Sequence, residues 1–130
     1  MTKEEHISYW IKNADRDWKR MQLCFKSKDY VFCLFCIHLS LEKLCKAIWV
    51  KYHKTDFPPR IHNLKYILEK TPVILSEDDW IFLLFINKFN LEGRYPDYAD
   101  KIYKICNKKL TQDTINKAKN IRLCLQKNLQ

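Results

Sequence analysis

The sequence YVFCLFCIHLSLEKLCKAIWVKYH, residues 30–53, decides the fold of this chain. Around an α-helix, its apolar side chains would point in nearly every direction instead of forming a single stripe. A helix of this kind is buried on most sides. We therefore expect it to lie centrally, between other helices or at a contact with a second copy of the chain. Asp29 directly precedes it and is a good N-cap residue.

Three polar residues interrupt this apolar stretch at one-turn intervals: His38, Glu42 and Lys46. At positions i, i+4 and i+8 their side chains share one face of the helix and can pair. Polar groups in a buried helix need partners, because burying them unpaired is costly. We favour a satisfied core network that positions the neighbouring helices. The alternative is a ligand-binding or catalytic carboxylate at Glu42. A histidine and a carboxylate without a third ligand are weak grounds for a metal site, and we predict none.

Outside this stretch, apolar residues recur at helical spacing in three longer segments and one short one. The segments predicted to be helical are residues 4–26, 63–70, 77–91 and 112–128. In residues 98–109 apolar residues alternate loosely with lysines, and we expect an irregular or weakly helical connection there. No alternating pattern of strand length occurs. The sequence therefore predicts a single all-α domain over residues 1–130, an antiparallel up-and-down bundle of four principal helices plus one short helix.

Capping and breaking residues set the predicted ends of these helices. Thr2 is a plausible N-cap for the first helix. Pro58-Pro59 forbids continuation of the central helix. His62 stands just before the short helix, where a histidine more often caps or packs a loop than performs chemistry. Ser76 has the spacing of a capping box, with Asp79 as the acid three residues later.

Length and composition fit one globular domain with its own core. The chain has 130 residues, of which 47% are apolar and 30% are charged. No run approaches roughly eighteen uncharged apolar residues, so no membrane span is predicted. The N-terminus lacks an apolar signal region, and we expect a cytoplasmic protein. Its six cysteines should then be reduced thiols. Cys33-x-x-Cys36 has no second pair with which to build a zinc or redox site.

The charge of the chain is +9 and is unevenly distributed. Residues 98–130 hold eight of the lysines and arginines against two acidic residues. Such an excess suits a polyanion or an acidic partner. A solvated, lysine-rich helix face explains it equally well.

The stretch FNLEGRYPDY, residues 89–98, ends the most hydrophobic run and holds the only glycine of the chain, Gly93. A glycine just past a helical pattern, followed by a proline, is the usual signal for the end of a helix. Phosphate-binding and dinucleotide-binding loops need several glycines, so these classes are excluded. The corner also carries Arg94, Tyr95 and Asp97, which form either a structural corner or a site.

These segments together resemble the HEPN family, small all-helical proteins of prokaryotes. The resemblance covers nearly the whole chain and depends on the order and spacing of five pieces. They are Trp10 with Ala14 and Asp17, Tyr30 with the run LEKLCK at 41–46, Pro58-Pro59, His62-Asn63-Leu64, and FNLEGRYPDY at 89–98. It implies an antiparallel helical bundle that pairs as a homodimer. Many HEPN proteins are metal-independent ribonucleases, often toxins, and others are partners of minimal nucleotidyltransferases.

The sequence departs from the ribonuclease pattern of that family. The pattern has an arginine followed four to six residues later by a histidine. Arg94 stands where this arginine is expected, but residues 95–101 contain no histidine. None of the other arginines has a histidine four to seven positions later either. Metal-free RNA cleavage needs a general base and a general acid, and we predict no catalytic residue.

We therefore expect a non-catalytic HEPN-like module that binds a nucleotide, a minimal nucleotidyltransferase partner or both, in a toxin–antitoxin-like context. Its site should lie where the corner meets the central helix, with no cofactor or metal. The candidate ligand-binding residues are Glu42, Lys46, Arg94, Tyr95 and Asp97. Arg94 would pair with a phosphate or with Glu42, Lys46 would add a second positive charge, and Tyr95 could stack. The same residues could instead form a polar cluster that fixes the end of the helix and the dimer contact.

Two alternatives remain open. The first is a metal-independent ribonuclease toxin with a degenerate active site, in which a tyrosine or an aspartate replaces the missing histidine. The second is a basic RNA-binding helical domain that uses Lys117, Lys119 and Arg122 of the last helix.

Overall fold

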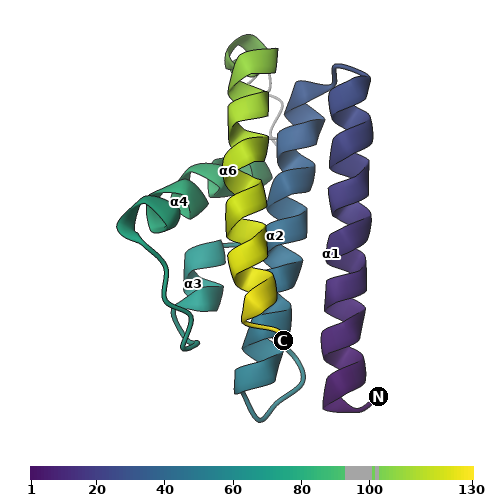
Figure 1. Cartoon of the computed structure of the whole chain (residues 1–130), viewed down its shortest axis with the longest axis vertical. Helices are drawn as coiled ribbons and strands as arrows, with labels where there is room; N and C mark the ends of the chain where they lie inside the picture. The colour runs from purple at the N-terminus through teal and green to yellow at the C-terminus, as the bar shows by residue number, and fades with distance from the viewer. Residues whose placement is uncertain (93–100, 102) are drawn as a thin grey trace.

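In a computed structural model of the chain, residues 1–92, 101 and 103–130 are described, and among them there are helices but no strand. The helices are α1 (Lys3–Lys26), α2 (Tyr30–Tyr52), α3 (Leu64–Leu68), α4 (Glu77–Glu92) and α6 (Lys108–Lys127). Figure 1 shows α1, α2 and α6 side by side along the long axis, with α3 and α4 on the side of α2 away from α1. The predicted fold class, an antiparallel bundle of four principal helices plus a short one, is confirmed.

The central helix α2 contacts α1, α3, α4 and α6. Its apolar side chains from Cys33 to Val50 are almost all buried against these four helices. The expected central position is therefore confirmed. Packing within one chain accounts for the apolar character of α2, without a contact to a second copy. Among the described residues, no helix combines the length and apolar composition needed to cross a membrane.

The hairpin of α1 and α2 begins and turns at residues whose side chains cap the helices. The hydroxyl of Thr2 accepts a hydrogen bond from the backbone N–H of Glu5, at 3.1 Å, and so caps the start of α1. Between the helices Lys28 adopts a positive φ of 65°. The carboxylate of Asp29 then accepts from the N–H of Phe32 at 3.3 Å. Both predicted N-caps are confirmed.

The final helix differs from its predicted extent. α6 starts at Lys108, four residues before the predicted start at Gln112, because Asn107 is its N-cap. The Asn107 side chain accepts a hydrogen bond from the N–H of Leu110 at 2.8 Å. Within the connection predicted to be irregular or weakly helical, Lys101 and residues 103–105 are helical, whereas Cys106 and Asn107 are not.

Candidate functional site

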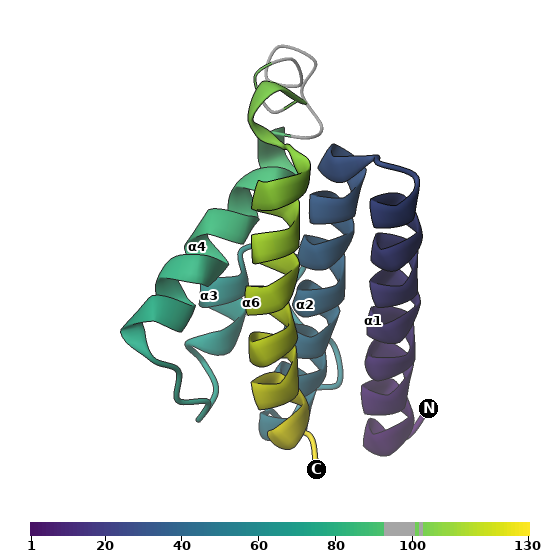
Figure 2. The ribbon, with the colours of Figure 1, turned by 45° about the horizontal axis from the view of Figure 1, so that its top comes forward.

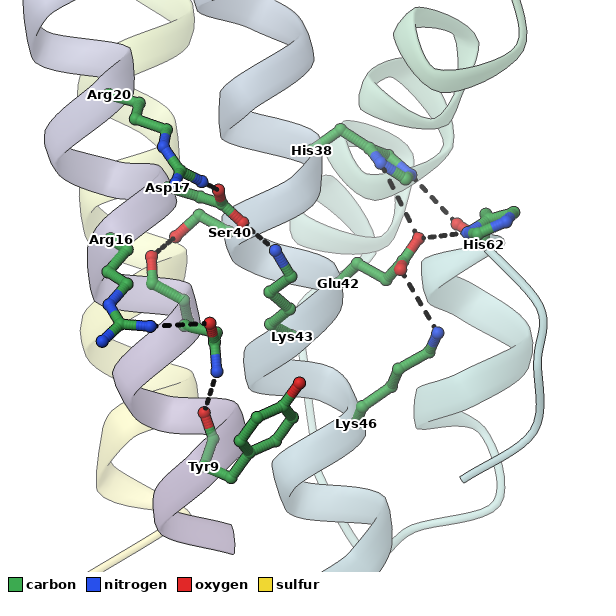
Figure 3. A network of polar contacts seen from close by, with 12 residues as sticks. Tyr9, Arg16, Asp17, Arg20, His38, Ser40, Glu42, Lys43, Lys46 and His62 are labelled. Carbon is green, nitrogen blue, oxygen red and sulfur yellow. Dashed lines mark hydrogen bonds and ion pairs between the residues drawn. The ribbon is translucent and has the colours of Figure 1, made fainter. Parts of the chain in front are cut away.

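A buried carboxylate on α2 is the centre of the candidate site. α2 places His38, Glu42 and Lys46 on one side, one helical turn apart. His62, in the connection that precedes α3, faces them from 20 residues further along the chain. Figure 3 shows the Glu42 side chain between the other three.

Two cationic or ionisable side chains hold the Glu42 carboxylate. Its Oε1 atom accepts a hydrogen bond from Nδ1 of His62 at 2.9 Å, and its Oε2 atom lies 3.3 Å from Nζ of Lys46. The side chains of Glu42 and Lys46 are only 6% and 8% exposed. A buried carboxylate needs such partners, because the free energy of leaving the charge unpaired is prohibitive. Nζ of Lys46 also lies 5.5 Å from the centre of the Trp10 ring, which links α1 to the cluster.

His38 belongs to the cluster without sharing a proton with Glu42. Its Nε2 atom lies 3.0 Å from the backbone carbonyl oxygen of His62. A carbonyl oxygen can only accept, so Nε2 carries the proton and Nδ1 of the neutral ring does not. Nδ1 lies 4.0 Å from Oε1 of Glu42 and has no hydrogen-bond partner among the described residues. Burial lowers the pKa of His38, against the opposing charge of Glu42, so the neutral ring is favoured.

His62 is the one member of the cluster that reaches solvent. Its side chain is 45% exposed, and its second ring nitrogen points away from Glu42 (Figure 3). A carboxylate that accepts from Nδ1 fixes the orientation of the ring and leaves Nε2 on its far side. The neighbouring Asn63 caps α3 by accepting from the N–H groups of Lys65 and Tyr66.

A second buried carboxylate, Asp17, joins α1 to α2. Its side chain is 1% exposed, pairs with Lys43 of α2, and accepts from Arg20 at 2.8 Å. One turn away, the hydroxyl of Ser40 donates to the carbonyl oxygen of Ala14 at 2.8 Å. All the partners of this cluster belong to α1 and α2, and none of its groups is shared with the Glu42 cluster.

The predicted site residues are only partly described. Glu42 and Lys46 lie together, as expected, whereas Arg94, Tyr95 and Asp97 fall outside the described residues. His62 was expected to cap or pack a loop, and its bond to Glu42 was not foreseen. Its place shortly after Pro58-Pro59 was a signal, because a chain that turns there returns toward α2. Among the described residues, no three His, Cys, Asp or Glu side chains are grouped so as to hold a metal ion.

The cysteine pair of α2 is buried and uncharged. Burial raises the pKa of Cys33 and of Cys36 to about 12, so both are thiols at neutral pH. All six cysteines of the chain are described, and each is a free thiol.

The basic residues predicted to bind RNA do not form one patch. Arg122 donates to Asp15 of α1 at 3.0 Å and lies 4.7 Å from the centre of the Trp18 ring. Lys117 borders α4, and Lys119 borders α1. The three side chains are therefore distributed over two sides of α6, with Arg122 already paired.

The described helices form a small bundle packed around one central helix, α2. Residues 7–128 match the family model described as "HEPN domain", and the chain belongs to the HEPN family. The fold is also similar to the crystal structure of TT1696 from Thermus thermophilus, with a TM-score of 0.80 and 18% sequence identity. That match covers 95% of this chain and 98% of TT1696. A search of curated proteins found no match.

Proposed function

We propose that this HEPN protein is a non-catalytic, homodimeric module that binds a nucleotide, a minimal nucleotidyltransferase partner or both. The observation that carries the proposal is the pairing of Glu42 with Lys46 and His62. Because the carboxylate is neutralised within the protein, it does not repel the phosphates of a nucleotide. The exposed edge of His62 and the guanidinium of Arg94 would then supply the donors.

The positions of the four histidines support the non-catalytic part of the proposal. None follows an arginine at the spacing of the family's ribonucleases. His38 is fully buried and His53 is stacked on Trp49 with ring centres 3.8 Å apart. His6 lies edge-on to Phe57. Only His62 combines exposure with a carboxylate partner.

Titration of the pure chain with ATP by isothermal calorimetry tests nucleotide binding. We expect Arg94→Ala to weaken binding by about tenfold, the usual effect of losing one charge-assisted hydrogen bond. His62→Gln should weaken it less, and His6→Gln should leave it unchanged. Equal affinities for the parent chain and Arg94→Ala would reject this site.

Co-expression with a small nucleotidyltransferase from the neighbouring reading frame tests the partner. We expect the two chains to purify together, and analytical ultracentrifugation to show a dimer of this chain at micromolar concentration. If the two chains do not purify together, the nucleotidyltransferase is rejected as the partner. If this chain sediments as a monomer, the homodimer is rejected.

The Glu42–His62 pair also favours a second candidate, a metal-independent ribonuclease. An exposed imidazole oriented by a buried carboxylate is a suitable general base for a 2′-hydroxyl. This candidate predicts RNA cleavage in the presence of EDTA that is abolished by Arg94→Ala and strongly reduced by His62→Gln. Intact RNA after incubation with the pure chain, while an active HEPN ribonuclease cuts it, would exclude this candidate.

A further inference from the structure

A groove of about 660 Å³ lies between α4 and α6, on the opposite side of the bundle from α1. In Figure 2 the start of α4 lies to the side of α6, and the two helices come closer toward the end of α4. Its volume is within the range of about 300–1,000 Å³ that is usual for binding pockets. It shares no residue with the Glu42 cluster.

The apolar part of the groove lining comes from both helices, and some of it is open to solvent. Phe82 and Ile121 are buried in its walls, with Phe85 beside them. Ile81 also lines the groove but is 56% exposed, and the neighbouring Leu84 on α4 is 45% exposed. Contiguous exposed apolar side chains on a folded domain commonly mark a surface that another molecule covers.

The charge of the groove is opposite to that of the chain. Asp78, Asp79 and Asp113 line it, with Lys117 as the one basic residue among its described lining residues. None of the three carboxylates forms an ion pair with a described basic side chain. The negative charges of Asp78 and Asp79 also stabilise the positive end of the α4 dipole. Asp113 lies beyond the first turn of α6 and has no such role. A local acidic rim on a chain of charge +9 selects a cationic occupant.

We propose that this groove is a docking site for a cationic amphipathic helix of another protein. The apolar floor would take leucine-like side chains at i, i+3, i+4 and i+7, and the three carboxylates would face lysines or arginines at the edges of the helix. A second copy of this chain is a poorer occupant. A two-fold contact centred on the groove would place acidic rim against acidic rim, and a head-to-tail contact would either close into a ring or continue into a filament. The proposal is independent of the nucleotide site.

A fluorescent peptide of about 18 residues, with leucines at the four anchor spacings and lysines elsewhere, is the probe for the full chain. A peptide of the same pattern with glutamates in place of the lysines is its control. The lysine peptide should bind, with an affinity that falls as salt is added, and the glutamate peptide should not. Amide shifts in the NMR spectrum should change along α4 and α6 around the groove and not along α1.

Matched substitutions identify the groove as the binding surface. Ile81→Ser should weaken binding of the lysine peptide by about tenfold. Leu123→Ser, at an equally exposed site on α6 outside the groove, should leave the affinity unchanged. The triple variant Asp78→Asn/Asp79→Asn/Asp113→Asn, which neutralises the rim, should also weaken binding of the lysine peptide by about tenfold. Glu77→Gln should have little effect on this affinity.

Three results would overturn the proposal. The first is equal binding of the two peptides or binding of neither. The second is peptide affinity that Ile81→Ser does not change. The third is a dimer in the parent chain that Ile81→Ser converts to a monomer, because the groove would then be an interface between copies.

Discussion

At the scale of single residues, Glu42 contributes to stability through the groups that surround it. Glu42→Gln leaves the ammonium group of Lys46 with no carboxylate in a place where it is 8% exposed. We expect the free energy of unfolding to fall by about 3 kcal/mol, the usual effect of removing one partner of a buried ion pair. Urea denaturation followed by circular dichroism measures this.

Two controls separate the contribution of the Glu42–Lys46 ion pair from other effects of the substitution. Glu69→Gln changes an exposed carboxylate at the end of α3 and should alter stability by less than about 0.5 kcal/mol. The double variant Glu42→Leu/Lys46→Leu should be more stable than Glu42→Leu alone, because neither charge is left buried. A Glu42→Gln variant as stable as the parent chain would show that the pair contributes nothing net.

His38 should make stability depend on pH. Its pKa in the folded protein lies below the ordinary value of 6.5. Below that pH the His38 side chain is therefore protonated in the unfolded chain before it is protonated in the folded chain. The stabilising contribution is complete above about pH 6.5 and decreases as the pH falls, with a slope of at most about 1.4 kcal/mol per pH unit. Urea denaturation of the parent chain between about pH 5.5 and 8 measures it.

His38→Gln is the informative variant, because its amide can still donate to the carbonyl oxygen of His62 but does not titrate in this range. Its pH slope should be smaller than that of the parent chain. His6→Gln, on the half-buried start of α1, should keep the slope of the parent. An unchanged slope in His38→Gln would assign the pH dependence to other groups.

At the scale of elements, the helices could be predicted wherever a single local signal was strong. α2 followed from its apolar composition, and the starts of α1 and α2 followed from Thr2 and Asp29. The start of α6 was missed because Asn107 lies among lysines, where no apolar periodicity draws attention to a cap. The partnership of Glu42 with Lys46 was readable from their spacing on one helix. The partnership with His62 was not, because it depends on how the loop after Pro58-Pro59 returns to α2.

The cap at Asn107 can be tested directly. Asn107→Ala removes the acceptor for the N–H of Leu110 and should lower stability by about 1 kcal/mol. Asn107→Asp should restore most of the loss, because aspartate is an equally good cap. Asn120→Ala, in the middle of the same helix, should be neutral or slightly stabilising. Equal effects of the two alanine variants would argue against the cap.

At the scale of the whole molecule, the bundle is unevenly held together. α1 and α6 pack against α2 along the long axis, whereas α4 packs on α2 and the five-residue α3, with the groove between it and α6. Because α4 is packed less extensively than α1 and α2, we expect its amides to exchange with solvent before those of these two helices. Native-state hydrogen exchange measured by NMR tests this. Equal protection in α2 and α4 would mean that the bundle opens only as one unit.

The aromatic contacts have a consequence for spectroscopy. Three of the four tryptophans lie against a cationic or ionisable side chain: Trp10 near Lys46, Trp18 near Arg122, and Trp49 near His53. The Trp49 and His53 rings are stacked at 3.8 Å and inclined by only 6°, and a protonated imidazole at such a distance quenches indole emission. The emission of Trp49 therefore depends on this contact and can change while the protein remains fully folded. The optical signature of unfolding is instead the far-ultraviolet circular dichroism of the helices.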